Sequence, residues 1–153
     1  MVQVLLKHKA DMDARDNSGE NALHNASNGA GPNIGPSLSN VAQLLLEHGA
    51  DVNARTDKDK GYCTPLHLAA RYGRIEVVHV LLQHGANVGT KDGDGRIALH
   101  QAADFGSVEV VRVLLQHGAD VGTEDGQGRT ALQLASDNGY HEIMKLLSEH
   151  CSG

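Results

Sequence analysis

Histidines are the most chemically versatile side chains in this chain, because imidazole binds metal ions and exchanges protons near neutral pH. Ten are present, and five recur at one position of a repeating pattern: His8, His48, His84, His117 and His150. If each belongs to a separate structural unit, neighbouring imidazoles lie roughly 10 Å apart, whereas zinc needs nitrogens about 2 Å away on one tetrahedron. We therefore expect no metal site in this row. Each imidazole should instead interact with the C-terminal end of a helix, and a pH-sensitive surface is the alternative.

Other patterns suggest chemistry and fall short of it. Cys63 and His67 lie four residues apart, where a thiol and a base could meet, but no acidic residue is placed to orient the imidazole. The glycine-rich segments KDGDGR and DGQGR lack the Lys-Ser/Thr of a nucleotide-binding loop. Their acidic residues, such as Asp92 and Asp125, lack the spacing of a calcium loop. We expect no catalytic, cofactor-binding or metal-binding residue, and an enzyme or metal protein is the disfavoured alternative.

Composition narrows the class of partner and the compartment. The formal net charge of −6 and the pI near 5.9 argue against nonspecific nucleic-acid binding, which depends on clustered Lys and Arg. No apolar run approaches the roughly 18 residues of a membrane span, and no signal peptide is visible. Cys63 and Cys151 lie in different units, and we interpret them as free thiols of a reducing compartment. We therefore expect a cytoplasmic or nuclear protein that binds neither nucleic acid nor membrane.

The elements that must position these residues repeat along the chain. The segment CTPLHLAARYGRIEVVHVLLQHGANVGTK (63–91) returns at 97–124 and again at 130–151, with Leu66, Leu99 and Leu132 spaced by 33 residues. A fixed period of this length is typical of a solenoid whose units stack on one another. The TPLHLA segment resembles the signature of ankyrin repeats. The resemblance implies an all-α fold, an ankyrin-repeat helical solenoid with β-hairpin-like finger loops.

The resemblance also implies local roles. Thr64 and Pro65 should open a first helix, and Gly73 should end it in a left-handed conformation. Three histidines at the fourth position of the signature should tie turn backbone between repeats: His24, His67 and His100. The position of Cys63 is one that the family leaves on variable surface.

We expect one domain over residues 1–153, with four full repeats and one half repeat. Asn21 to Gly49 is seven residues longer than Thr64 to Gly85, which predicts an inserted loop, and a second insertion of three residues lengthens the segment 56–63. The units are a half repeat (1–15), a repeat with a loop insertion at 28–40 (16–55), a repeat with a long finger (56–91), a repeat (92–124) and a C-terminal capping repeat (125–153). The half repeat suggests a monomer that could self-associate through its N-terminal edge, or a spacer segment of a longer array.

The function that the resemblance implies is recognition of another protein by a concave face and finger tips. Its exposed positions are the pairs Arg71-Tyr72, Asp104-Phe105 and Asp137-Asn138, together with Arg96, Arg129 and the long-finger residues Lys58, Lys60 and Tyr62. Two neighbouring aromatics, Tyr72 and Phe105, flanked by arginines have the composition of an interface hot spot. The alternative is that Phe105 packs against Tyr72 or a finger.

Asn53 carries a different expectation. In LLEHGADVNAR it follows Asp51 by two residues and Leu45 by eight. This pattern resembles the finger site that Fe(II)/2-oxoglutarate asparaginyl hydroxylases modify on ankyrin proteins. An ordinary finger asparagine is the alternative interpretation.

Overall fold

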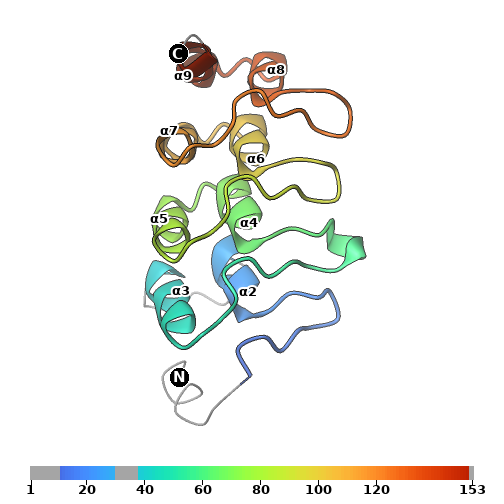
Figure 1. The fold of residues 1–153 in the computed structure, drawn as a ribbon, viewed down its shortest axis with the longest axis vertical. Coiled ribbons are helices and arrows are strands. Elements are labelled where there is room, and N and C mark those ends of the chain that lie inside the picture. Colours follow the sequence, from blue (N-terminus) through green and yellow to red (C-terminus); the bar gives the residue numbers. More distant parts are fainter. Residues whose placement is uncertain (1–10, 30–37, 152–153) are drawn as a thin grey trace.

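The structure is a computed structural model that describes residues 11–29 and 38–151, and it stacks pairs of short helices in two columns (Figure 1). An inner column contains α2, α4, α6 and α8, and an outer column contains α3, α5, α7 and α9; successive members of each column pack on one another. The helix bounds are α2 Ala22–Asn28, α3 Leu38–Glu47, α4 Pro65–Arg71, α5 Ile75–Gln83, α6 Ala98–Asp104, α7 Val108–Gln116, α8 Ala131–Asp137 and α9 His141–Cys151. No β-strand occurs in this described part, and the all-α solenoid expected from the sequence is confirmed.

The first helix of each pair begins and ends as its local sequence predicts. Thr64 and Thr130 accept hydrogen bonds from backbone N–H groups three residues on, which satisfies donors that a helix start leaves unpaired. Gly73 ends the following turn at φ +64°, in the left-handed region that disfavours side chains.

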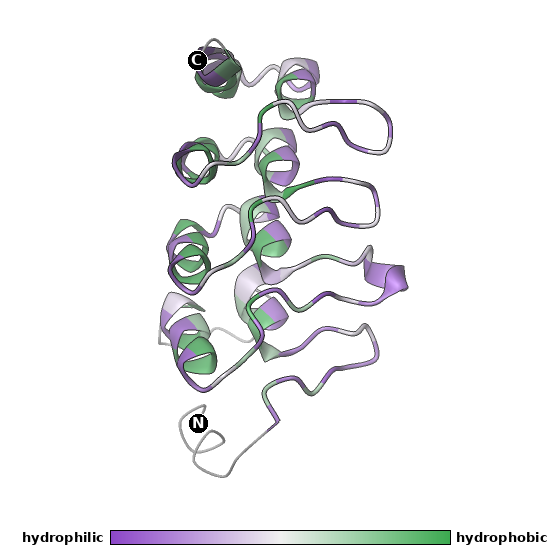
Figure 2. Cartoon of the chain, in the orientation of Figure 1, coloured by the Kyte–Doolittle hydropathy of each residue, from purple (hydrophilic) through white to green (hydrophobic). Residues whose placement is uncertain are grey.

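The core runs continuously between the two columns. Leu66 is 1% exposed, and Ala69 and Ala70 are fully buried. Alanine lets α4 approach α2 and α6 closely, so each layer is thin and depends on its neighbours for burial. Figure 2 shows hydrophobic residues on both columns and hydrophilic ones along the projecting loops. None of the described helices is both long enough and apolar enough to cross a bilayer.

The insertion expected at 28–40 is shorter than predicted. Asn28 completes α2 and Gly29 follows it at φ +76°, so the helix ends one residue later than expected. Leu38 to Asn40 form the first turn of α3, where partly buried Leu38 packs against the core. Burial of this apolar residue favours helix over loop. The remainder, 30–37, lies outside the described residues, as do residues 1–10 of the expected half repeat.

The loops that we call fingers (48–64, 84–97 and 117–130) project from the inner column. Each has one backbone hydrogen bond across its base, such as Asp92 N–H to the Arg96 carbonyl (2.8 Å), with further bonds only inside the turn. The fingers therefore resemble hairpins without forming strands. The additional residues of the long finger (48–64) form a 3₁₀ turn, η1, at Lys58–Lys60. Tyr62, two residues beyond it, has φ +54° and is the one non-glycine residue with positive φ in the described part.

Candidate partner-binding groove

The signature histidines join each repeat to the next finger. His67 Nδ1 accepts the Thr64 N–H (3.1 Å), and its Nε2 donates to the Arg96 carbonyl (2.9 Å). His24 and His100 make the equivalent contacts with the Ala54 and Arg129 carbonyls. Burial disfavours imidazolium and lowers the pKa of all three. The structural role that the resemblance implied is therefore confirmed.

The histidine row is also structural. In its four described members, Nδ1 donates to the carbonyl four residues earlier in the same helix, at 2.8–2.9 Å: His48, His84, His117 and His150. In His48, His84 and His117 the backbone N–H donates to the same carbonyl, so the imidazole adds a second hydrogen bond to that acceptor at the helix end. His8 lies outside the described residues. Within the described ranges, no group of three or more His, Cys, Asp or Glu could hold a metal ion.

Cys63 does not lie on variable surface, and that expectation was wrong. Its N–H donates to Thr56 Oγ1 and its carbonyl accepts the Thr56 N–H, both at 2.9 Å, so the closing contact of the long finger holds it against the stack. It is 6% exposed. Burial, reinforced by Asp92, raises the pKa of its thiol to about 11, which keeps the sulfur protonated at neutral pH. His67 Nδ1 is already occupied by Thr64, so the two do not form a nucleophile–base pair.

The two predicted aromatics end adjacent inner helices. Tyr72 and Phe105 follow α4 and α6 directly, and 51% and 48% of each residue is exposed. The Arg71 guanidinium carbon lies 5.0 Å from the centre of the Phe105 ring, so this ring supports a cation of the preceding repeat. On the long finger, Tyr62 makes a similar contact with Arg55 at 5.5 Å. The structure therefore exposes all three aromatics on the side of the inner helices and fingers.

Two of the three arginines expected beside these aromatics, Arg96 and Arg129, already form ion pairs within the fold. Arg96 Nη1 lies 3.0 Å from Asp104 Oδ2, and its side chain is only 17% exposed. Asn138 Nδ2 donates to the other Asp104 oxygen at 3.0 Å. Arg129 pairs with Asp125 at 3.0 Å. Contact of Arg96 and Arg129 with a partner stays a prediction, and it would have to compete with carboxylates that already pair with both side chains.

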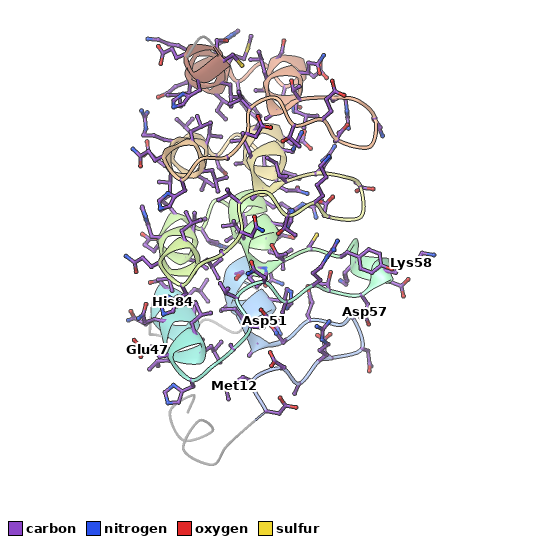
Figure 3. All side chains as sticks on the ribbon, in the orientation of Figure 1. Met12, Glu47, Asp51, Asp57, Lys58 and His84 are labelled. Carbon is purple, nitrogen blue, oxygen red and sulfur yellow. The ribbon has the colours of Figure 1, made fainter. Side chains whose placement is uncertain are left out.

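Two hollows lie where the long finger meets the inner helices, and together we call them the groove. One of about 480 Å³ is lined by Lys60, Arg71, Tyr72 and Arg74 among others. The other, of about 410 Å³, shares Lys60 and Arg71 with it and adds Lys58 and Gln101. Lys58 stands at the tip of the long finger, on the opposite side of the stack from Glu47 and His84 of the outer column (Figure 3).

Comparison with known proteins identifies the repeats. The family model described as "Ankyrin repeats (3 copies)" matches residues 1–92 and 86–153. The chain belongs to the ankyrin repeat family. An ankyrin repeat domain is in general terms a protein-interaction module.

Three curated relatives are similar to this chain over part of its length. Ankyrin repeat and SOCS box protein 16 of Mus musculus is 39% identical over 95 residues, 61% of this chain and 20% of the relative. Probable E3 ubiquitin-protein ligase XBOS34 of Oryza sativa subsp. japonica is 48% identical over 65 residues, 42% of this chain and 12% of the relative. Ankyrin repeat and SOCS box protein 9 of Mus musculus is 44% identical over 55 residues, which is 36% of this chain and 18% of the relative. The match thus spans a fifth or less of these relatives.

Sequence reasoning missed two groove residues of this ankyrin domain. Gln101 occupies the position that Leu68 and Leu134 hold in neighbouring repeats, and this departure from the repeat pattern was the available signal. Its Nε2 donates to Asp92 Oδ2 at 2.9 Å, while its buried Oε1 has no hydrogen-bond partner among the described residues. Arg74 follows the helix-ending Gly73 and reaches Gly29 of the preceding repeat. No local pattern marks that contact.

The buried Asp125 of the last finger explains where the Arg129 side chain goes. Asp125 Oδ1 accepts the Gln127 and Arg129 N–H groups, and Oδ2 accepts the Arg129 guanidinium. Burial acts to raise the pKa of this carboxyl, but these hydrogen bonds and the Arg129 charge outweigh it and lower the pKa to about 2. A buried, ionised carboxylate therefore holds Arg129 in place.

Proposed function

We propose that this ankyrin repeat domain recognises a partner protein through the groove and the adjoining inner-helix ends. The observation that carries the proposal is the exposure of Tyr72 and Phe105, about half of each residue, on neighbouring repeats. Large apolar side chains exposed together are a common feature of protein interfaces, whose binding energy concentrates in aromatic and arginine side chains. Tyr62 and the long-finger lysines Lys58 and Lys60 extend this surface.

The role we propose is binding without a reaction of its own. The ligase and SOCS-box terms belong to the names of the relatives, and this chain matches only small parts of those proteins. Cys63, the residue that had suggested a nucleophile, is buried and its thiol is held protonated. We propose that the domain works as a monomer in the cytoplasm or nucleus; two free thiols support a reducing compartment. Light scattering over a range of concentrations tests the monomer.

The deciding experiment compares intact protein with the double variant Tyr72→Ala/Phe105→Ala as bait in cell lysate, with captured proteins identified by mass spectrometry. Tyr140→Ala is the matched control, because Tyr140 is similarly exposed but packs over Gly106 at the turn after α8. The double variant should bind the captured partner more weakly by at least about 2 kcal/mol, with little change in unfolding free energy. Unchanged binding together with a large loss of stability would show that these aromatics serve the fold.

Hydroxylation of Asn53 stays a separate proposal. The side chain is exposed, and its Oδ1 accepts the Asn87 N–H at 2.9 Å, so it links two fingers. Its Cβ could be modified without removing that amide oxygen. Incubation with an Fe(II)/2-oxoglutarate asparaginyl hydroxylase should add the mass of one oxygen atom to intact protein and none to Asn53→Ala. No mass gain in the intact chain would refute the proposal.

A further inference from the structure

The groove holds cations that the fold leaves without a carboxylate. Four basic side chains line it without forming an ion pair with any described residue: Lys58, Lys60, Arg71 and Arg74. Four acids, Glu20, Asp59, Asp92 and Asp94, also line it, as does the ion-paired Arg96. The two hollows together thus contain five basic and four acidic side chains, on a chain whose formal net charge is −6. The groove therefore brings four basic groups that form no ion pair with a described residue together on this acidic protein.

Arg71 is the best-placed of these cations. It lines both hollows, and its guanidinium makes no hydrogen bond to a described residue. The Phe105 ring beneath it limits the orientations of the guanidinium plane. A planar guanidinium held in this way presents paired N–H donors that fit a carboxylate, with less side-chain entropy left to lose on binding.

A second observation points to a ligand with N–H donors. Gln101 is 4% exposed and lines the hollow that contains Lys58 and Arg71. Its Nε2–Asp92 hydrogen bond fixes the amide orientation and leaves Oε1 as an unpartnered buried acceptor among the described residues. Such an acceptor costs free energy until a donor reaches it. An extended peptide offers a backbone N–H at nearly every residue.

We propose that the groove binds an acidic peptide segment of the partner, with a carboxylate paired to Arg71 and apolar side chains against Tyr72 and Phe105. Lys60 and Arg74, which line the same hollow as Arg71, add attraction for further carboxylates. This inference rests on the proposed recognition role and specifies the chemistry of its partner.

The test uses two fluorescein-labelled peptides of about twelve residues, one alternating glutamate with leucine and the other glutamine with leucine. Intact protein should bind the glutamate peptide at least about tenfold more tightly at physiological salt. Arg71→Gln should abolish this preference. The control Arg112→Gln, an exposed arginine of the outer helix α7, should retain it within about twofold. Equal affinity of the two peptides for intact protein, no binding by about 1 mM, or a preference that survives Arg71→Gln would overturn the proposal.

The same variants separate this inference from the broader proposal. If a captured partner is lost with Tyr72→Ala/Phe105→Ala but retained with Arg71→Gln, partner recognition stands and the acidic segment is wrong. If no capture depends on the aromatics while the peptide preference depends on Arg71, the anion site stands and the proposed partner surface is wrong. Circular dichroism of each variant confirms that the helices are intact.

Discussion

The groove beside the long finger and the surface one repeat further along both contain charged side chains, but only those of the groove include cations without an ion pair. We call the further surface, formed by Arg96, Asp104, Asp125, Arg129 and Asn138, the paired surface. On that further surface, Arg96, which also lines the groove, pairs with Asp104, Asn138 donates to the same carboxylate, and Arg129 is bound to Asp125. In the groove, Lys58, Lys60, Arg71 and Arg74 form no ion pair with a described residue. A count of arginines in the sequence therefore overestimates the number of cations that a partner could reach on the paired surface and underestimates it in the groove. Binding capacity follows from which charges remain unpaired after the repeats have stacked.

One finger position differs between the long finger and the other fingers. Asp16, Asp92 and Asp125 each lie five residues before a helix N-cap and accept backbone N–H groups of their own turn. In the long finger the equivalent residue is Thr56, whose hydroxyl accepts the Cys63 N–H. A neutral hydroxyl provides no charge to pair with nearby cations. The long finger therefore lacks the charge by which Asp125 pairs with Arg96 and Arg129 in the last finger.

The largest expected effect comes from removing the buried acid of the paired surface. Asp125→Ala should lower the unfolding free energy by about 3 kcal/mol, because Arg96, Arg129 and two backbone N–H groups lose their acceptor. Thr56→Val, at the equivalent position of the long finger, should cost only about 1 kcal/mol. Urea denaturation near pH 7 measures both losses. Equal losses of unfolding free energy would show that Asp125 and Thr56 contribute equally to stability, contrary to this prediction.

The same comparison has a pH signature. The Asp125 carboxyl has a lowered pKa in the folded protein, so its contribution is present at pH values above its unfolded pKa and is lost as pH falls toward about 2. The difference in stability between intact protein and Asp125→Ala should therefore shrink under strongly acidic conditions. A difference that stays constant down to that pH would contradict the role assigned to the ionised carboxylate.

A second prediction concerns His67, whose hydrogen bond to the Arg96 carbonyl links the repeat that contains α4 to the next finger. His67 is buried with a lowered pKa, so the unfolded chain takes up its proton first as pH falls below about 6.5. Stability should therefore decrease between pH 7 and pH 5, by at most about 1.4 kcal/mol per pH unit for each such histidine. His67→Gln, which copies Gln133 of the last repeat, should reduce that slope relative to intact protein. If urea titrations give the same slope of unfolding free energy against pH for intact protein and His67→Gln, His67 is not the source of the pH dependence.

A third prediction measures the pairing itself. A double-mutant cycle on Arg96 and Asp104, each replaced by Ala, should give a coupling energy near 1 kcal/mol, because the pair is close and partly shielded. A cycle on Arg71 and Asp94, which line one hollow without an ion pair, should give about zero. Coupling of similar size in both cycles would mean that the groove cations are already satisfied.

The smallest expected effect is on the tip of the long finger. Lys58→Ala/Lys60→Ala should change the unfolding free energy by less than about 0.5 kcal/mol, since both side chains are exposed and unpaired within the described structure. The pair is therefore suited to binding experiments without a folding penalty. A clear drop in the urea midpoint would indicate a structural role for these lysines.

The sequence by itself determined the features that depend on nearest neighbours along the chain. The 33-residue period, the helix start at Thr64 and Pro65 and the stop at Gly73 were predicted correctly, because caps and left-handed glycines act within a few residues. The hydrogen-bonding role of His67 followed from the family resemblance.

Tertiary structure alone decided which side chains remain available. Arg96 contacts Asp104 and Asp125, eight and 29 residues away, and the Phe105 ring supports Arg71 from the next repeat. Cys63 was expected on the surface, but the closing contact of the long finger buries it. Such contacts depend on the offset between stacked repeats. The periodicity of the sequence determines that the repeats stack. The distances between side chains of adjacent repeats then determine which charges form ion pairs.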